Sequence, residues 1–292
     1  MSLEGEIVLQ DGRKLAYMEF GRPDGLPVFY FHGTPAARVE PILIGDDRFS
    51  SLGLRIISPD RPGMGGSSFQ RERRYLDWPA DVIALADALG LDRFSVLGFG
   101  GGAPYAAACA VKVPERLRAV VVVSGVWRMD WPEALEGAAR PFRVMTYLAR
   151  RCPILLYPTL GMMGPMAGGD LDHIGGELKK IVPPVEHAAM ADPSRLEGYR
   201  KILYETVVQG VRGSAWDLRL LVRDFGFALD EVRVPITLFH GELDTVALIA
   251  MARRAAGALP SAQLITFEDQ GHFSTLCNKL EEIARALNAH SI

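Results

Sequence analysis

Residues 94–105 read Phe-Ser-Val-Leu-Gly-Phe-Gly-Gly-Gly-Ala-Pro-Tyr, and this stretch joins a strand pattern to a glycine turn and a helix pattern. Phe94–Leu97 is apolar almost throughout, as strands buried on both faces of a sheet are. Ala103–Val113 is rich in alanine and stops before Pro114, which predicts a helix. The stretch therefore predicts a strand–turn–helix unit inside an α/β protein.

Strand-like runs recur along the chain, and helical patterns separate several of them. The runs are Lys14–Phe20, Val28–Phe31, Leu54–Ser58, Ala119–Val123, Ile236–His240 and Leu264–Phe267. An amphipathic helix is expected over Tyr75–Leu89, with Gly90 as its stop. Asp11-Gly12 is a strong hairpin signal, so the sheet should open with an antiparallel pair. The alternation predicts an α/β fold whose mostly parallel sheet is flanked by helices.

Residues 126–225 differ from the rest because they contain no convincing strand. Helix-like stretches broken by prolines fill this region, and the Gly- and Met-rich stretch Leu160–Gly169 is expected to be a loop. We expect residues 1–125 and 226–292 to form one α/β core, into which residues 126–225 are inserted as a helical cap. An insertion of this length is too long for a plain loop and indicates a functional element.

The composition describes an ordinary globular protein. Of the 292 residues, 49% are hydrophobic and 23% are charged, which excludes intrinsic disorder. The net charge of −3 gives no reason to expect nucleic acid or an anionic membrane as a partner. No run approaches the length of a membrane span, and the first residues lack the apolar region of a secretory signal. We therefore expect a cytoplasmic protein.

Cysteine usage agrees with a reducing compartment. Cys109, Cys152 and Cys277 are too few and too scattered for a disulfide scaffold, and none has a C-x-x-C spacing. We expect three free thiols.

Five loops follow strand ends, which is where open parallel sheets bind their ligands. They are residues 32–35 (His-Gly-Thr-Pro), 60–68 (Asp-Arg-Pro-Gly-Met-Gly-Gly-Ser-Ser), 98–102 (Gly-Phe-Gly-Gly-Gly), 241–244 (Gly-Glu-Leu-Asp) and 271–273 (Gly-His-Phe). In this order the loops resemble those of the α/β-hydrolase superfamily, in particular its esterases and lipases with a cap. The resemblance covers nearly the whole chain, and it implies hydrolysis of an ester or a related acyl compound through a Ser-His-Asp type triad.

The resemblance also implies roles for single residues. The serine nucleophile belongs at the centre of a Gly-x-Ser-x-Gly turn, and this position falls on Gly100. His272 would be the general base, and Asp244 would be the acid that orients it and stabilises its imidazolium. No metal and no cofactor are implied.

A second group of residues would bind the oxyanion. In the family, two backbone N–H groups face the developing negative charge, one after the nucleophile and one in the His-Gly loop. Carried over by position, these belong to Gly101 and Thr34. His32 and Gly33 would support the loop without transferring protons.

Gly100 is the departure from the family's pattern. Glycine has no side chain, so no acyl-enzyme can form there, and the sequence as given should be inactive or severely impaired. One explanation is an inactivated variant, which the retention of the other machinery favours. The other is a natural protein that binds a ligand without catalysis or carries out non-hydrolytic chemistry. Ser124 and Cys109 are further nucleophile candidates, but neither has the strand-to-helix context.

Other interpretations of these loops compete with the catalytic one. Asp244 would also serve as the N-cap of a helix that begins near Val246, and Glu242 is the alternative acid. Residues 98–103 fit a dinucleotide-binding fingerprint, but no acidic residue ends a following strand about 20 residues on. No cluster of His, Asp or Glu has the spacing of metal ligands.

The inserted helices are expected to roof the glycine turn. They are rich in aromatic residues and methionine, and such side chains form adaptable apolar walls. We expect a small-molecule substrate that is apolar. The sequence carries no feature that specifies an oligomeric state.

Overall fold

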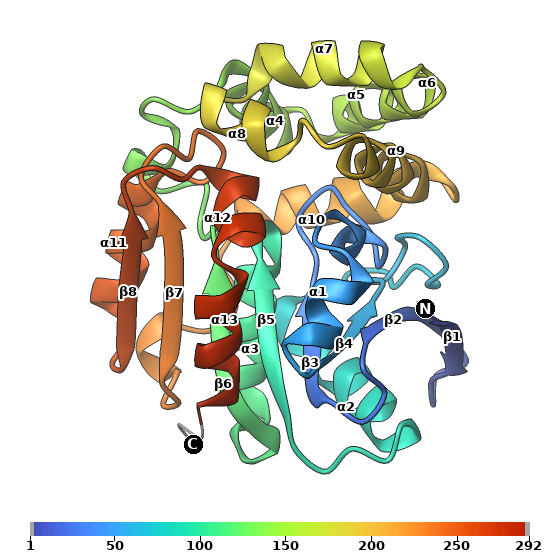
Figure 1. Ribbon diagram of the computed structural model, residues 1–292, viewed down its shortest axis with the longest axis vertical. Coiled ribbons are helices and arrows are strands. Elements are labelled where there is room, and N and C mark those ends of the chain that lie inside the picture. Colours follow the sequence, from blue (N-terminus) through green and yellow to red (C-terminus); the bar gives the residue numbers. More distant parts are fainter. Residues whose placement is uncertain (1–2, 290–292) are drawn as a thin grey trace.

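The computed structural model describes residues 3–289 and contains one eight-stranded sheet, in the order β1-β2-β4-β3-β5-β6-β7-β8 (Figure 1). The strands are β1 (Leu3–Val8), β2 (Lys14–Gly21), β3 (Leu26–Phe31), β4 (Leu54–Pro59), β5 (Phe94–Phe99), β6 (Leu117–Val123), β7 (Ile236–Gly241) and β8 (Ala262–Phe267). The pairs β1–β2 and β2–β4 are antiparallel, and all other neighbours are parallel. The predicted fold class and the opening hairpin at Asp11-Gly12 are confirmed.

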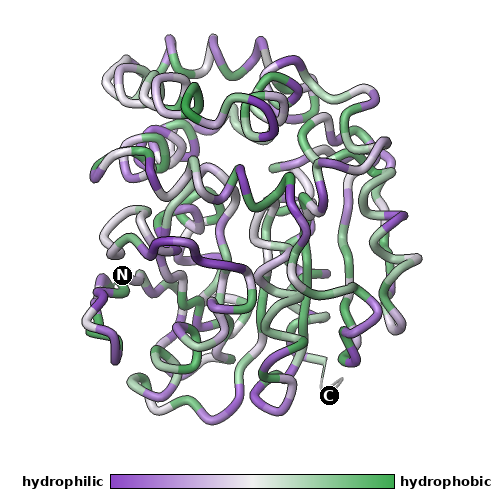
Figure 2. Tube along the Cα trace, turned by 180° about the vertical axis from the view of Figure 1, so that it is seen from behind, coloured by the Kyte–Doolittle hydropathy of each residue, from purple (hydrophilic) through white to green (hydrophobic). Residues whose placement is uncertain are grey.

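Helices cover both faces of this sheet. One face carries α2 (Trp78–Ala88), α3 (Ala103–Lys112) and α11 (Ile249–Ala258), and the other carries α1 (Asp46–Ser51), α12 (His272–Asn278) and α13 (Leu280–Asn288). Side chains alternate along each strand, so Val96 of β5 joins the first core and Leu97 joins the second. Every residue of β5 is buried, which explains why its sequence is apolar apart from Ser95. In Figure 2 hydrophobic colouring runs along the central strands.

The described part of the chain between β6 and β7 contains helices and no strand. They are α4 (Arg140–Arg151), α5 (Leu156–Gly161), α6 (Met163–Ala167), α7 (Leu171–Ile181), α8 (Pro184–Ala189), α9 (Pro193–Val207) and α10 (Arg212–Leu221). Figure 1 shows α4–α9 as a layer above the carboxyl ends of the strands. That residues 126–225 form a separate cap stays a prediction.

Some local expectations were wrong. The stretch Leu160–Gly169 is not a loop, because α5 and α6 occupy most of it. The helix after Asp244 begins at Ile249 and not near Val246, and Asp244 is therefore not its N-cap. His272 lies at the first position of helix α12.

Candidate active site

Gly100 lies at the sharp turn between β5 and α3. Its φ of +49° is left-handed, a conformation in which residues with side chains are strained. A Cβ built on Gly100 would lie 3.3 Å from Nε2 of His272 and 3.6 Å from the Cα atom of Gly33. The backbone therefore has the shape that projects a side chain from residue 100 toward His272, although glycine provides none.

His272 and Asp244 are brought together by two loops that follow β7 and β8. Nδ1 of His272 lies 2.8 Å from Oδ2 of Asp244, and both side chains are buried. The other carboxylate oxygen of Asp244 accepts hydrogen bonds from the backbone N–H groups of Val246 and Ala247, at 2.8 and 2.9 Å. These bonds hold the carboxylate in place, and Nε2, on the other side of the His272 ring, faces the Cβ position of residue 100.

Carboxylates around His272 raise the pKa of its imidazole. Burial alone would lower the pKa of His272, but attraction and a hydrogen bond to Asp244, together with Glu186 and Glu40, raise it above its ordinary value. Because only the neutral imidazole can accept a proton, His272 needs a higher pH for this than an ordinary histidine does.

The competing residues lie elsewhere. Glu242 faces Arg253, at 3.4 Å, and is not among the hydrogen-bond partners of His272. The Ser124 hydroxyl is fully buried and donates to the backbone oxygen of His272, at 3.0 Å. Burial raises the pKa of the Cys109 thiol well above its usual range, so this group is a poor nucleophile.

The loop after β3 meets the glycine turn closely. A Cβ on Gly101 would lie 3.2 Å from the backbone nitrogen of Thr34 and 2.4 Å from its Oγ1, so only glycine fits at residue 101. The backbone nitrogens of these two residues are the expected oxyanion donors, and their catalytic role stays a prediction.

His32 and Gly33 make several hydrogen bonds within this loop and with Arg61, and their role as its support stays a prediction. The buried His32 ring lies with Nδ1 2.9 Å from the Gly33 oxygen, and the backbone N–H of Arg61 points to Nε2 at 3.4 Å. Burial and the nearby Arg61 keep the pKa of His32 well below its ordinary value, which leaves the ring neutral. These contacts are structural and do not direct a ring nitrogen to the glycine turn.

A buried ion network beneath the Thr34 loop is absent from the sequence prediction. Asp217 of α10 pairs with Arg61 and Arg73, at 2.7 and 2.5 Å, and also accepts hydrogen bonds from Tyr105 and Thr34. Burial alone would raise the pKa of Asp217, but the two arginines hold it well below its usual range. Arg61 also donates to the backbone oxygens of residues 32 and 33. Arg61 belongs to the loop at residues 60–68, but the sequence predicted no role for this residue, and nothing in the sequence marks Asp217.

Two further buried acids near His272 were also missed. Oε2 of Glu40 accepts hydrogen bonds from the Tyr30 hydroxyl and the Gly33 N–H, at 2.9 and 2.8 Å. Glu186 of α8 accepts from the backbone N–H groups of Phe273 and Ser274, both at 3.1 Å, at the N-terminus of α12. Neither acid belongs to a motif, so the sequence alone gave no signal for them.

Two small cavities meet at His272. One of about 40 Å³ contains Gly100 and Gly101, and its other walls are mainly apolar side chains such as Met129, Met145 and Leu218. The second, of about 120 Å³, lies over Gly33 and Glu40 and is roofed by α7 and α9. Thr34, Phe142, Val246 and His272 line both cavities.

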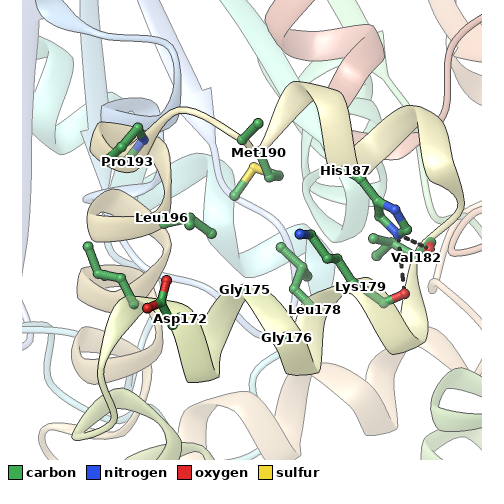
Figure 3. A pocket seen from close by; sticks show the side chains of 12 residues that line it. Asp172, Gly175, Gly176, Leu178, Lys179, Val182, His187, Met190, Pro193 and Leu196 are labelled. Atoms are coloured by element: carbon green, nitrogen blue, oxygen red, sulfur yellow. Dashed lines mark hydrogen bonds between the residues drawn. The ribbon is translucent and has the colours of Figure 1, made fainter.

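A third cavity, here called the outer cavity, borders α7. It has a volume of about 430 Å³ and is enclosed by α7, α8 and the start of α9 (Figure 3). Leu178 and Val182 line this outer cavity and also the 120 Å³ cavity inside. Helix α7 is therefore the wall between the two.

Within residues 3–289, no group of three or more His, Cys, Asp or Glu side chains is arranged to hold a metal ion. None of the helices described is both long and apolar enough to cross a membrane.

Comparisons with known proteins identify the family. The profile described as "Alpha/beta hydrolase family" matches residues 28–286. The chain is 36% identical over 265 residues to the 2-hydroxymuconate semialdehyde hydrolase of Pseudomonas putida, an alignment that covers 87% of this chain and 83% of that protein. It is also 35% identical over 130 residues to a non-heme chloroperoxidase of Streptomyces lividans, but this alignment spans only 42% of the chain and 45% of the relative.

Solved structures share the fold over nearly the full length. A hydrolase from Pseudomonas aeruginosa PA01 superimposes with a TM-score of 0.67 at 19% identity, covering 98% of this chain and 97% of that one. An esterase from Exiguobacterium antarcticum has a TM-score of 0.65 at 18% identity, with coverage of 97% on both sides. At such identities the likeness concerns the fold alone.

Proposed function

The chain belongs to the alpha/beta hydrolase family, and from this premise we propose that its site is built to hydrolyse a carboxylic ester or a related acyl compound. The proposed parts are a base, His272, an orienting acid, Asp244, and an oxyanion hole formed by the backbone N–H groups of Thr34 and Gly101. Gly100 occupies the position of the nucleophile, so the chain as given is inactive or severely impaired.

One observation carries the proposal. Nε2 of His272 lies 3.3 Å from the Cβ position of residue 100, while its Nδ1 is held at 2.8 Å by Asp244. A serine at residue 100 would bring its hydroxyl within reach of Nε2. The retained left-handed backbone supports the interpretation that glycine replaces a serine.

The reaction then follows from these groups when a serine is present. His272 takes the hydroxyl proton as the oxygen attacks the carbonyl carbon, and the carbonyl oxygen becomes an oxyanion between the two N–H donors. The imidazolium, stabilised by Asp244, returns the proton to the leaving group as the bond to the carbonyl breaks. Water activated by His272 cleaves the acyl-enzyme in the same way.

Residues 126–225 are proposed to act as a cap over this site. Phe142 of α4, Met163 of α6 and Tyr199 of α9 line the 120 Å³ cavity, and Met145 lines the smaller one. The walls are mostly apolar and the volumes are small, which supports a small substrate with apolar parts.

The test is to restore the serine. We expect Gly100→Ser to raise the hydrolysis of short-chain p-nitrophenyl esters by about 10³-fold or more, as restoration of a triad member does. Adding His272→Ala to this variant should remove the gain, and Gly100→Ala is the matched control without a hydroxyl. An unchanged rate in a folded Gly100→Ser variant would contradict the proposal and favour a protein that only binds its ligand.

A further inference from the structure

The 120 Å³ cavity contains an acid that the proposed mechanism does not use. Glu40 lines this cavity and is only 3% exposed. Both of its hydrogen bonds, from the Tyr30 hydroxyl and the Gly33 N–H, go to Oε2. Within residues 3–289, Oε1 has no hydrogen-bond partner, and it lies 3.1 Å from the Cβ position of Gly33. Oε1 is therefore an acceptor that is left for a ligand in this cavity.

The charges of Arg61 and His272 attract the Glu40 carboxylate, but among the described residues no lysine or arginine forms an ion pair with it. The described residues that line the two cavities include no lysine or arginine. Arg61 lies nearby but is engaged with Asp217 and with backbone oxygens. Burial raises the pKa of Glu40 to about 7, so the group is mostly a carboxylate in mildly alkaline solution. The remaining walls of the cavity are largely apolar and strengthen any charge interaction there.

Resting on the proposed hydrolase function, we propose that Glu40 is a specificity-determining residue whose Oε1 accepts a hydrogen bond from the substrate. The site then prefers substrates that carry an ammonium or another hydrogen-bond donor, and it rejects substrates that carry a carboxylate. A charge-assisted hydrogen bond to a buried carboxylate is stronger than a neutral one. A carboxylate in the same cavity would meet the like charge of Glu40 and would find no lysine or arginine in the cavity walls.

The position of Glu40 makes this selection possible during the reaction. Gly33, whose N–H binds Glu40, lies 3.6 Å through its Cα from the Cβ position of residue 100. The substrate group that reaches Glu40 is therefore attached close to the reacting carbonyl and extends into the 120 Å³ cavity. Tyr199 lines the same cavity.

Binding to the unmodified chain tests the inference without any need for catalysis. The first series of probes is ethyl 4-aminobutanoate, ethyl pentanoate and monoethyl succinate, whose acyl chains end in an ammonium, a methyl and a carboxylate group. The second series is three butanoate esters whose alcohol parts end in the same three groups. In at least one of the two series, titration calorimetry at pH 8.5 should show that the ammonium probe binds at least about tenfold more tightly than the methyl probe. The carboxylate probe should bind at least about tenfold more weakly than the methyl one. Equal binding of the three, or no binding of either ammonium probe at millimolar concentration, overturns the inference.

Glu40→Gln is the matched variant. Its amide oxygen still accepts from Tyr30 and Gly33, while the amide NH₂ replaces Oε1. The preference for ammonium over carboxylate should fall by at least about tenfold. Glu197→Gln, which removes the same charge from a surface pair with Arg200, should leave it unchanged. A folded Glu40→Gln variant that keeps the preference overturns the inference.

The same probes separate this inference from the proposed function. In Gly100→Ser, kcat/KM should follow the order of the affinities. A Gly100→Ser variant that hydrolyses none of the esters while the unmodified chain still selects the ammonium probe would remove the proposed hydrolysis and leave the role of Glu40 standing. If Glu40→Gln does not fold, the order of the affinities of the three probes for the unmodified chain still tests the inference.

Discussion

At residue 100 the backbone is left-handed, so any side chain there is strained whatever its chemistry. We predict that Gly100→Ser and Gly100→Ala each lower the free energy of unfolding by about 1–2 kcal/mol. Urea titration followed by circular dichroism measures the loss. Because the two variants share the Cβ and differ in the hydroxyl, only the serine variant should gain esterase activity. A stability equal to that of the unmodified chain in both variants would mean that residue 100 does not adopt this conformation.

The carboxylates around His272 give a pH dependence with a definite sign. Attraction by Asp244, Glu186 and Glu40 outweighs burial and raises the pKa of His272, so a higher pH is needed to keep the base neutral. We predict that kcat/KM of Gly100→Ser falls on the acid side with a midpoint above about 6.5, the ordinary value for histidine. Asp244→Asn in the same background should lower both the rate and this midpoint. A midpoint below the ordinary value, or one indifferent to Asp244→Asn, would argue against this electrostatic account.

The sequence led to residues that belong to ordered motifs and missed those that act through distant partners. His272 and Asp244 follow two predicted strands in a recognisable order, and the structure brings them within hydrogen-bond distance. Glu40 and Asp217 have no such signal, since an isolated acid reads as a surface residue. Their burial depends on partners from other parts of the chain, and only the folded structure shows these partners.

At the scale of elements, α8 and α12 are joined by one buried carboxylate. Glu186 accepts hydrogen bonds from two N–H groups in the first turn of α12, the turn that also carries His272. We predict that Glu186→Ala lowers the free energy of unfolding by about 2 kcal/mol, because these buried donors lose their acceptor. Differential scanning calorimetry measures the loss. Glu177→Ala, in an exposed pair of α7, is the control and should have little effect. Equal effects of the two substitutions would refute the assigned contact.

Helix α10 is held to the core by the pairing of Asp217 with Arg61 and Arg73. Removal of the only carboxylate in this group would leave two buried guanidinium groups without their counter-ion. We predict that Asp217→Asn lowers the free energy of unfolding by about 3–5 kcal/mol, whereas Glu197→Gln at an exposed pair changes it by less than about 1 kcal/mol. Parallel urea titrations compare the two variants. A small loss in Asp217→Asn would show that water or another anion compensates the arginines.

Long elements were easier to predict than short ones. The strands and α2 and α3 have apolar patterns over enough residues to be recognised. The short helices α1, α5, α6 and α8 were missed, because isolated helices of this length are marginal and depend on tertiary packing. The same reason explains why α12 was not expected to begin at His272.

At the scale of the whole molecule, the sheet and its covering helices follow from local patterns, whereas the arrangement of α4–α10 does not. Buried parallel strands have a distinctive composition, and their connections restrict the topology. The helices between β6 and β7 have no comparable restriction. Contacts between helices, such as those of α7 with α9, decide which helix faces line the cavities. The sequence patterns do not link the residues that make these contacts.

Helix α7 should be the part of this molecule that responds most to a ligand. Among residues 171–180 only Ile174 and Leu178 are buried, whereas β5 is buried throughout. Local opening requires little free energy where few apolar side chains are buried, so in hydrogen exchange measured by mass spectrometry the amides of α7 should exchange faster than those of β5 and β6. Leu178 and Val182 also line the 120 Å³ cavity, and a ligand bound there adds contacts to them. Saturation of the unmodified chain with ethyl 4-aminobutanoate should therefore slow exchange in α7 and leave the hairpin of β1 and β2, an internal control, unchanged. Unaltered exchange in α7 at saturation would show that the ligand does not occupy the cavity beneath this helix.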